Sequence, residues 1–305
     1  MIFKIDSSIR TNSTKDTNLL LANALCAACE HGHYVDMEFQ VHRWIVDTIL
    51  DSGDYMGRLQ SETLKNNLEF WLPNEQQKRD LKYVYVGGSD EKSVTLSEMY
   101  YLADKMSWVV LENATYDGAT IRRWVELLHN RRQFGSTYDA VYDAINNGLL
   151  DLYHAGGGDG TISNAIRELK RQNPQIKRVY RWKTTTIFDS DKKSSKDTEE
   201  HNTSLIRFLN EEHIDFHELV CREIENYFLP QTYEQAKMEV KKEDILAGLN
   251  KETWKYVDLA EIYEMEKSDV ANKLCPNLTY LMLTEDEYSQ IEEIKQVILH
   301  MAKYI

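Results

Sequence analysis

Acidic residues follow three segments that are predicted to be strands of one sheet. Glu112 and the pair Asp189 and Asp191 lie just after apolar, β-branched runs, and Asp159 follows another such run through three glycines. Because the carboxyl ends of parallel strands meet at one edge of a sheet, we expect these side chains to lie close together. Residues two apart on an extended chain point the same way, so Asp189 and Asp191 are predicted to aim both carboxylates at one point.

Carboxylates gathered in this way need a neutralising cation. Two of them cannot both stay charged in close contact unless a cation or strong hydrogen-bond donors compensate the charge. Mg²⁺ prefers hard oxygen ligands and keeps waters where protein ligands are few, and Mn²⁺ takes the same class of ligand. Together with Asp117, these acids would suffice for a two-metal centre of the kind that cleaves phosphodiesters.

Alternating strand-like and helix-like segments are predicted to position these acids. From residue 106 onwards the sequence alternates in the manner of βαβ units, which predicts an α/β fold around a parallel sheet. The predicted strands span residues 108–111, 149–153 and 184–188, and the predicted helices span 119–129, 138–146 and 161–171. An earlier short strand, near 81–86, ends at paired glycines, and we expect sheet structure to begin there.

The rest of the chain is predicted to be mostly helical. Residues 1–80 carry apolar side chains at helical spacing and no evident chemistry, and 231–305 have the same pattern. Residues 192–203 have the composition of a polar loop, and 205–229 are predicted to form a long helix. The predicted organisation is therefore a helical region at 1–80, an α/β catalytic domain at 81–230 and a helical region at 231–305.

The order of these motifs resembles a known domain. A glutamate ends the first strand, a glycine turn follows the second, and a D-x-D follows the third, as in the TOPRIM domain of topoisomerases, primases and small nucleases. The segment 222–229, REIENYFL, is similar to one that follows the D-x-D in nucleases of the OLD (overcoming lysogenization defect) group and in the nuclease subunit of PARIS-type phage defence. The resemblance covers residues 106–230 and implies a TOPRIM-like, Rossmann-like parallel sheet core with helical extensions at both ends.

The resemblance also implies roles for particular residues. Glu112, Asp189 and Asp191 would be the catalytic acids, with Glu112 as general base or metal ligand. Glu225 would be a ligand of a second metal ion, positioned by its neighbours Asn226 and Tyr227. The implied ligands of Mg²⁺ or Mn²⁺ are, in full, Glu112, Asp117, Asp159, Asp189, Asp191 and Glu225.

Basic residues near these acids are predicted to bind nucleic-acid phosphates. The stretch 167–183 is rich in Lys and Arg and leads directly to the strand before Asp189, and further basic residues lie at 122–132 and at 192–193. Phosphate neutralisation by such side chains supplies much of the affinity for nucleic acid. The predicted contacts are Arg122, Arg123, Lys177, Arg178, Arg181, Lys183, Lys192 and Lys193.

One competing motif predicts a different enzyme. Residues 157–161, GGDGT, also match the signature of diacylglycerol-kinase-like and NAD-kinase-like enzymes, whose glycines admit nucleotide phosphates to a helix amino end. Those families contain a further G-T-x-N segment that does not follow residue 161 here, and they do not predict the D-x-D. A third interpretation is a non-catalytic subunit that keeps the fold and binds nucleic acid or a partner.

Composition limits the remaining choices. The 305 residues carry 36 Lys and Arg against 50 Asp and Glu, a formal charge of −14, so nucleic-acid contact must be local rather than a matter of bulk charge. No apolar run is long enough to span a bilayer, and the first residues lack the pattern of a signal peptide, so a cytoplasmic location without membrane contact is expected. The four cysteines are expected to be packing residues, including Cys26 and Cys29, whose proximity to His31 and His33 resembles a zinc motif only superficially.

The sequence contains no G-x-x-x-x-G-K-[ST] motif, so the ATPase that accompanies TOPRIM in full OLD proteins is not expected in this chain. This favours a compact Mg²⁺-dependent endonuclease acting on DNA or RNA, with tRNA among the substrates considered. The helical regions would regulate it, form a homodimer or bind a separate ATPase or sensor subunit. Such an arrangement would suit a toxic effector of anti-phage defence.

Overall fold

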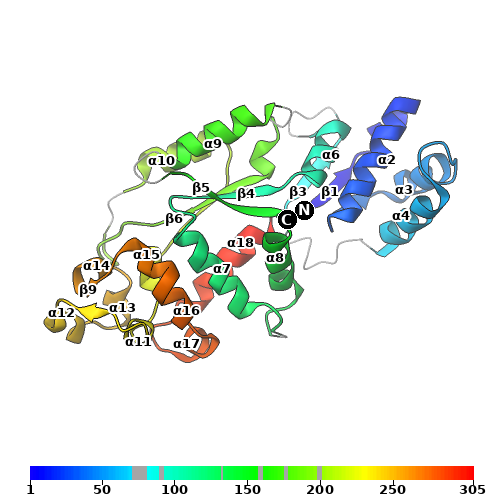
Figure 1. The fold of residues 1–305 in the computed structure, drawn as a ribbon. Helices are drawn as coiled ribbons and strands as arrows, with labels where there is room; N and C mark the ends of the chain where they lie inside the picture. The colour runs from blue at the N-terminus through cyan, green and yellow to red at the C-terminus, as the bar shows by residue number, and fades with distance from the viewer. Residues whose placement is uncertain (71–80, 89–92, 132, 157–160, 175–177, 198–200) are drawn as a thin grey trace. The chain divides into compact units, whose positions relative to one another are not determined.

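The chain forms two compact units. The computed structural model describes residues 1–70, 81–88, 93–131, 133–156, 161–174, 178–197 and 201–305 (Figure 1). Unit 1 comprises Met1–Ser107, Lys170–Lys183 and Ala302–Ile305, and unit 2 comprises Trp108–Leu169 and Thr184–Met301. Each unit contains parallel strands with helices around them, so the α/β class is confirmed. The division does not follow the predicted boundary at residue 80.

Unit 1 is built on a sheet of three parallel strands in the order β2-β1-β3, formed by Ile2–Ile5 (β1), Tyr34–Met37 (β2) and Tyr83–Val86 (β3). Residues 1–80 were predicted to be mostly helical, and the described part of this region is, but the prediction missed the two strands β1 and β2 that lie within it. Strands of four residues are too short to show the alternation that distinguishes a strand from a helix turn.

The helices of unit 1 pack on this sheet and on each other. Helix α2 begins after Thr14, whose hydroxyl accepts the Thr17 N–H while the Thr17 hydroxyl accepts the Thr14 N–H. Its buried face, which includes Leu21 and Leu25, packs on α6. The helical elements are α1 (Ser8–Thr11), α2 (Lys15–Glu30), α3 (Phe39–Ile45), the π-helix η1 (Val46–Leu50), α4 (Arg58–Phe70), α6 (Leu96–Asp104) and the 3₁₀ turn η3 (Tyr180–Trp182).

The sheet of unit 2 has the order β5-β4-β6-β7, from Ser107–Leu111 (β4), Leu150–His154 (β5), Thr184–Phe188 (β6) and Phe216–Glu218 (β7). Strand β6 runs parallel to both β4 and β7. Every residue of β4 and β6 is buried, as expected for central strands with both faces covered. Two of the three buried threonines of β6 make local hydrogen bonds: Thr186 donates to the Val110 carbonyl at 2.7 Å and Thr185 to the Asp215 carbonyl at 2.8 Å. The hydroxyl of the third, Thr184, makes no hydrogen bond within the described residues.

Helices cover both faces of this sheet, with α9 and α10 on one side and α7 and α18 on the other (Figure 1). Three of the predicted helices are present within two residues of their expected starts. The larger helices are α7 (Asp117–Leu128), α8 (Ser136–Asn146), α9 (Thr161–Gln172), whose last turn belongs to unit 1, α10 (Thr203–Glu211) and α18 (Ile291–Ala302).

The long helix predicted for 205–229 does not form. Helix α10 ends at Glu211, and the chain then forms the edge strand β7 and a 3₁₀ turn, η4 (Ile224–Tyr227). His213 has a positive φ of 56°, a conformation that ends a helix, and Ile214 is buried just before β7.

The remainder of unit 2 consists of short helices and one strand pair. Its elements are α11 (Pro230–Gln235), β8 (Glu239–Val240), α12 (Glu243–Ala247), α13 (Lys251–Trp254), α14 (Leu259–Ile262), β9 (Tyr263–Glu264), α15 (Lys267–Asp269), the π-helix η5 (Val270–Leu274), α16 (Cys275–Asn277) and α17 (Tyr280–Glu285). Strands β8 and β9 pair antiparallel. The rings of Tyr233 in α11 and Tyr263 in β9 are stacked, with their centroids 4.4 Å apart, and so pack these two elements together. In the described part of the chain no helix combines the length and apolarity needed to cross a membrane.

Candidate metal and phosphate site

Glu112 and Asp117 lie at the carboxyl end of β4, as predicted. Glu112 is the first residue after the strand, and Asp117 is the first residue of α7. The turn between them is held by reciprocal bonds: the Asn113 N–H donates to Asp117 Oδ2 at 3.0 Å, and the Asp117 N–H donates to the Asn113 carbonyl at 2.8 Å. Ala114 N–H donates to His154 Nδ1 at the end of β5, which fixes the turn against the neighbouring strand.

Asp189 follows β6 directly, but the backbone at Asp191 is not extended as the prediction assumed. The prediction assumed an extended chain, whereas Asp191 has a φ of 57°, and its N–H donates to the Arg222 carbonyl at 3.0 Å. The backbone therefore turns away from the strand direction between the two acids. Asp191 is exposed, and its charge acts on Glu223.

Glu223 and Glu225 reach the same region from the turn η4. Asn226, which is 1% exposed, holds the turn: its Oδ1 accepts the Glu223 N–H at 3.0 Å, and its Nδ2 donates to the carbonyls of Trp254 and Val257. The Tyr233 hydroxyl donates to the Glu225 carbonyl at 3.1 Å. The REIENYFL segment is thus a rigid, buried support for two carboxylates.

The carboxylates of these segments act strongly on one another. Burial raises the pKa of Asp189 well above its ordinary value, and the charges of Glu225, Asp117, Glu112 and Glu223 raise it further. Burial also raises the pKa of Asp117 to about 6, with a contribution from Glu112. The pKa of Glu225 is raised by burial and by Asp117, and that of Glu223 by burial and by Glu225. The structure therefore brings Glu112, Asp117, Asp189 and Glu225 together and adds Glu223.

The donor chemistry of this group fits a hard divalent cation. Its members are carboxylates, and burial raises the pKa of Asp117 and of Glu225. The positive charge of Lys267 lowers the pKa of both of these residues. Glu112, Asp117 and Asp189 line one small cavity of about 10 Å³, space for roughly one water-sized group. As they stand, no three His, Cys, Asp or Glu side chains of the described residues converge closely enough to hold a metal ion.

A larger cavity of about 430 Å³ adjoins the acids in unit 2. Glu112 lines it together with the first turns of α9 and the residues at the start of α10. Arg167 lies there with its guanidinium 4.6 Å above the Phe208 ring, and it donates to Asn164 Oδ1 at 3.1 Å. Asn202 also lines the cavity and donates to the Asp189 carbonyl at 2.9 Å, which links the cavity wall to the acidic group.

Three of the predicted phosphate contacts are engaged elsewhere. Lys183 is 2% exposed within unit 1, and burial lowers its pKa to about 7, so it cannot reach a phosphate from this position. Arg178, also in unit 1, pairs with Glu98 at 2.7 Å. Arg123 donates to the Leu278 carbonyl at 2.7 and 3.2 Å. These three residues are therefore not part of the proposed site: the sequence shows their charges but neither their burial nor their partners.

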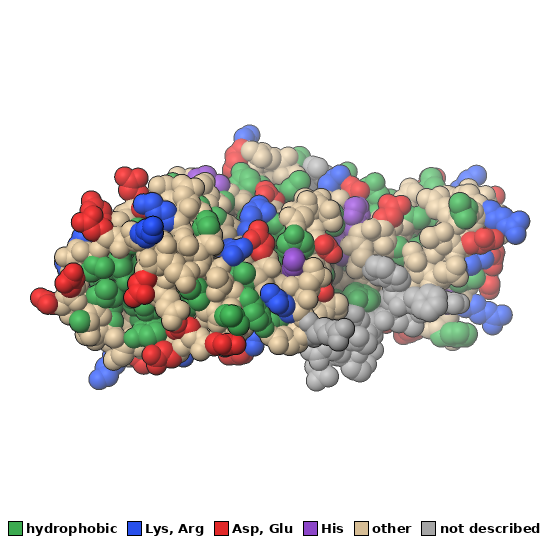
Figure 2. Space-filling view, turned by 60° about the horizontal axis from the view of Figure 1, so that its bottom comes forward, with side chains coloured by type: hydrophobic (Ala, Val, Ile, Leu, Met, Phe, Trp, Pro, Cys, Tyr) green, Lys and Arg blue, Asp and Glu red, His purple; other side chains and the backbone are tan. Residues whose placement is uncertain are grey.

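The other predicted basic contacts differ in how exposed their side chains are. Arg122 and Lys193 are exposed, Lys192 is half-buried, and Arg181 lies 4.1 Å above the Trp182 ring in unit 1. Lys177 and the predicted ligand Asp159 lie outside the described residues, as does most of the GGDGT motif. On the face shown in Figure 2, described Lys and Arg side chains are interspersed with Asp and Glu and form no continuous basic track.

Several residues of the site were not singled out from the sequence. Glu223 could have been found, because it belongs to the same REIENYFL segment as Glu225. His201 and Asn202 stand in what was expected to be a featureless polar loop, and His201 Nε2 lies 3.1 Å from Asp197 Oδ2. Lys267 lies in the predicted helical carboxyl-terminal region, where no sequence signal relates it to the acids.

The raised pKa of Asp117 predicts a stability difference that grows with pH. The pKa of Asp117 in the folded state, about 6, exceeds the ordinary value of 3.8, so the folded state favours the protonated carboxyl. The protonated carboxyl therefore contributes to the stability of the fold below about pH 4, and this contribution is lost as pH rises through 6. We expect Asp117→Asn in EDTA to gain up to about 3 kcal/mol relative to wild type between pH 4 and pH 8. Urea unfolding at both pH values measures this, and an equal difference at both would contradict it.

Comparisons with known proteins do not assign the chain to a family. No protein-family model, curated protein or solved structure matches it. The resemblance to TOPRIM nucleases therefore stays a prediction from the sequence, and the function has to be argued from the residues of the site.

Proposed function

We propose that this protein hydrolyses phosphodiester bonds of DNA or RNA with the help of Mg²⁺ or Mn²⁺. The observation that carries the proposal is the position of Glu112, which lines both the small cavity with Asp117 and Asp189 and the larger cavity with Arg167. A cluster of carboxylates suited to cations thus adjoins a cavity with a guanidinium suited to phosphate. That combination is suited to phosphodiester hydrolysis, in which metal ions and a guanidinium can both stabilise charge on the phosphate.

The acidic residues would hold the metal. Asp189, Glu112 and Asp117 are the proposed ligands, with Glu225 and Glu223 supplied from the rigid η4 turn. A bound divalent ion would lower the pKa of a coordinated water and neutralise charge on the phosphate oxygens. Asn202 keeps the Asp189 backbone in place through its bond to the carbonyl, and the Asn113 turn does the same for Glu112 and Asp117.

The larger cavity would receive the phosphate. Arg167 keeps its guanidinium partly fixed by Phe208 and Asn164, so little side-chain freedom is lost when it binds an anion. The Thr161 hydroxyl, at the first residue of α9, is buried and makes no hydrogen bond within the described structure. The exposed Arg167 guanidinium is suited to donate to a phosphate oxygen beside Glu112, whereas the covered Thr161 hydroxyl would do so only after a local shift.

A cleavage assay with a matched pair of arginine variants tests this proposal. We expect Mg²⁺-dependent cleavage of at least one of plasmid, single-stranded DNA and tRNA, and about a tenfold or larger loss of kcat/KM in Arg167→Ala. Arg207→Ala, an exposed arginine on the neighbouring α10, serves as the control and should keep wild-type activity. Absence of metal-dependent cleavage on all three substrates would instead support a non-catalytic binding subunit.

A role in phage defence is proposed on the resemblance to OLD and PARIS nucleases alone. Under that proposal the chain is a toxic effector that acts with a separate ATPase or sensor subunit. Expression of the wild type and of Asp189→Asn in the same host tests toxicity: the wild type, once released from its partner, should arrest growth, and the variant should not.

A further inference from the structure

Unit 1 contains a second cavity, of about 680 Å³, at the carboxyl end of its own parallel sheet. Strand β1 lies between β2 and β3. The chain goes from β1 to β2 on one side of it, and the next strand, β3, lies on the other side of β1. In open α/β sheets ligands bind at such a reversal, in the crevice beyond the strand ends. The cavity is lined by residues that follow β1 and β3, which is where this rule places a ligand.

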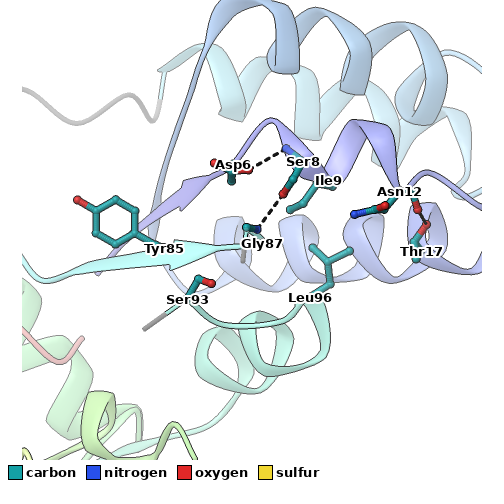
Figure 3. Close-up of a pocket in the computed structure, with 10 residues that line it drawn as sticks. Asp6, Ser8, Ile9, Asn12, Thr17, Tyr85, Gly87, Ser93 and Leu96 are labelled. Atoms are coloured by element: carbon teal, nitrogen blue, oxygen red, sulfur yellow. Dashed lines mark hydrogen bonds between the residues drawn. The ribbon is translucent and has the colours of Figure 1, made fainter. Parts of the chain in front are cut away.

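Two hydrogen bonds hold the walls of this cavity, one within the segment after β1 and one between the ends of β1 and β3 (Figure 3). The Ser8 N–H donates to Asp6 Oδ1 at 2.8 Å, and the Gly88 N–H donates to the Ser8 hydroxyl at 2.8 Å. Gly87 has a φ of +83°, and a Cβ there would meet the Ile9 side chain of α1 at 2.7 Å, so only glycine allows the β3 end to approach α1 this closely.

The chemistry of the lining selects the kind of ligand. Hydrogen bonds from the side chain and backbone of Ser8 lower the pKa of Asp6, so this carboxylate is ionised at neutral pH and only accepts hydrogen bonds. The described lining residues include hydroxyl and amide side chains but no Lys, Arg or His, and the basic group nearest to the Tyr85 ring among the contacts of that ring is Lys4 Nζ, 5.9 Å from its centroid. Tyr85, 54% exposed, presents an aromatic ring at the same edge. A ligand should therefore carry hydroxyl donors and a flat ring, and needs no phosphate for anchorage.

We propose that this cavity binds a nucleoside, with sugar hydroxyls donating to Asp6 and the base lying against Tyr85. The volume suits a ligand of this size, and base stacking on an aromatic side chain is a common source of affinity. The site lies wholly within unit 1 and is independent of the proposed nuclease function. A free nucleoside and the nucleoside end of a nucleotide share this chemistry, and the test separates them.

Calorimetric titration of the full chain tests the proposal. We expect adenosine to bind with a Kd of about 1 mM or lower, AMP to bind no more tightly, and 2′,3′-dideoxyadenosine to bind about tenfold or more weakly. A clear preference for AMP would assign the site to nucleotides and overturn the inference that no phosphate anchor is used. Lack of adenosine binding at about 1 mM would overturn the proposal as a whole.

Variants locate the binding in this cavity. Asp6→Asn should weaken adenosine about tenfold and remove the preference over the dideoxy compound, because the amide accepts hydroxyl donors less strongly than the carboxylate. Tyr85→Ala, at an exposed position that does not threaten folding, should also weaken binding, and Tyr85→Phe should not. Asp16→Asn, an exposed acid on α2 outside the lining, is the matched control. Unchanged affinity in both Asp6→Asn and Tyr85→Ala would place any binding elsewhere.

Discussion

Replacing Asp189 by Asn is expected to abolish metal-dependent cleavage and, at the same time, to make the metal-free protein more resistant to unfolding. We expect a loss of activity of about a hundredfold or more, because the amide removes the most strongly perturbed carboxylate of the proposed site. A catalytic role for Asp189 predicts that the substitution raises the stability of the metal-free protein, and a structural role predicts that it lowers it. Measuring activity and unfolding together therefore separates the two roles.

The gain in stability follows from the electrostatics of the acidic group. Burial and the charges of Glu225, Asp117 and Glu112 raise the pKa of Asp189, so ionising it in the folded state costs free energy that ionising it in the unfolded chain does not. This cost is absent below the ordinary pKa and grows as pH rises through the raised value. An isosteric amide removes the charge at all pH values, so its advantage is largest at neutral and alkaline pH.

Thermal unfolding with and without Mg²⁺ measures this prediction. In EDTA, the Tm of Asp189→Asn should exceed that of the wild type, and Mg²⁺ should raise the wild-type Tm but change that of the variant little, because ligand binding stabilises only the state that binds. Asp269→Asn is the matched control: that carboxylate pairs with Lys273 at 2.9 Å and accepts the Glu266 N–H, so its loss should lower the Tm. A lower Tm for Asp189→Asn in EDTA would show that Asp189 is a structural residue.

The strands that position the acids could be predicted because they are buried on both faces. In β4 and β6 every residue is buried, so each reads as a continuous run of apolar and β-branched residues, and the acid directly after each run marks the strand end. That pattern led to Glu112 and Asp189 without any knowledge of the fold. Glu225 came from a motif resemblance, and the structure shows why the motif is rigid: Asn226 and Tyr227 are both buried.

Other features depend on tertiary context that sequence does not carry. The strands β1 and β2 are four residues each, and their pairing with β3 brings together segments far apart in the chain. Asp191 has a left-handed backbone conformation, which no local pattern predicted. Lys183 and Arg167 belong to one basic stretch in the sequence, yet one is buried in unit 1 and the other lines a cavity of unit 2.

Replacing Asn226 by Ala is expected to destabilise unit 2 more than any single change on its surface. The side chain is buried and makes three hydrogen bonds, to the Glu223 N–H and to the carbonyls of Trp254 and Val257. Alanine would leave these backbone groups without partners in a place that water reaches poorly. At roughly 1–3 kcal/mol for each unsatisfied buried group, and allowing for relaxation, we expect a loss of about 3–5 kcal/mol.

The same change is expected to weaken metal binding through Glu223 and Glu225 rather than through any direct contact. Hydrogen exchange of unit 2 amides measures the stability loss, and the Mg²⁺-induced rise in Tm measures the second effect, which should be smaller than in the wild type. Asn210→Ala, at an exposed position on α10, should change neither quantity appreciably. A stability loss below about 1 kcal/mol would show that the η4 turn does not depend on Asn226. If the variant loses the full amount of about 3–5 kcal/mol of stability but Mg²⁺ still raises its Tm as much as that of the wild type, the η4 turn does not contribute to metal binding. The carboxylates that bind the ion would then be only those that follow β4 and β6.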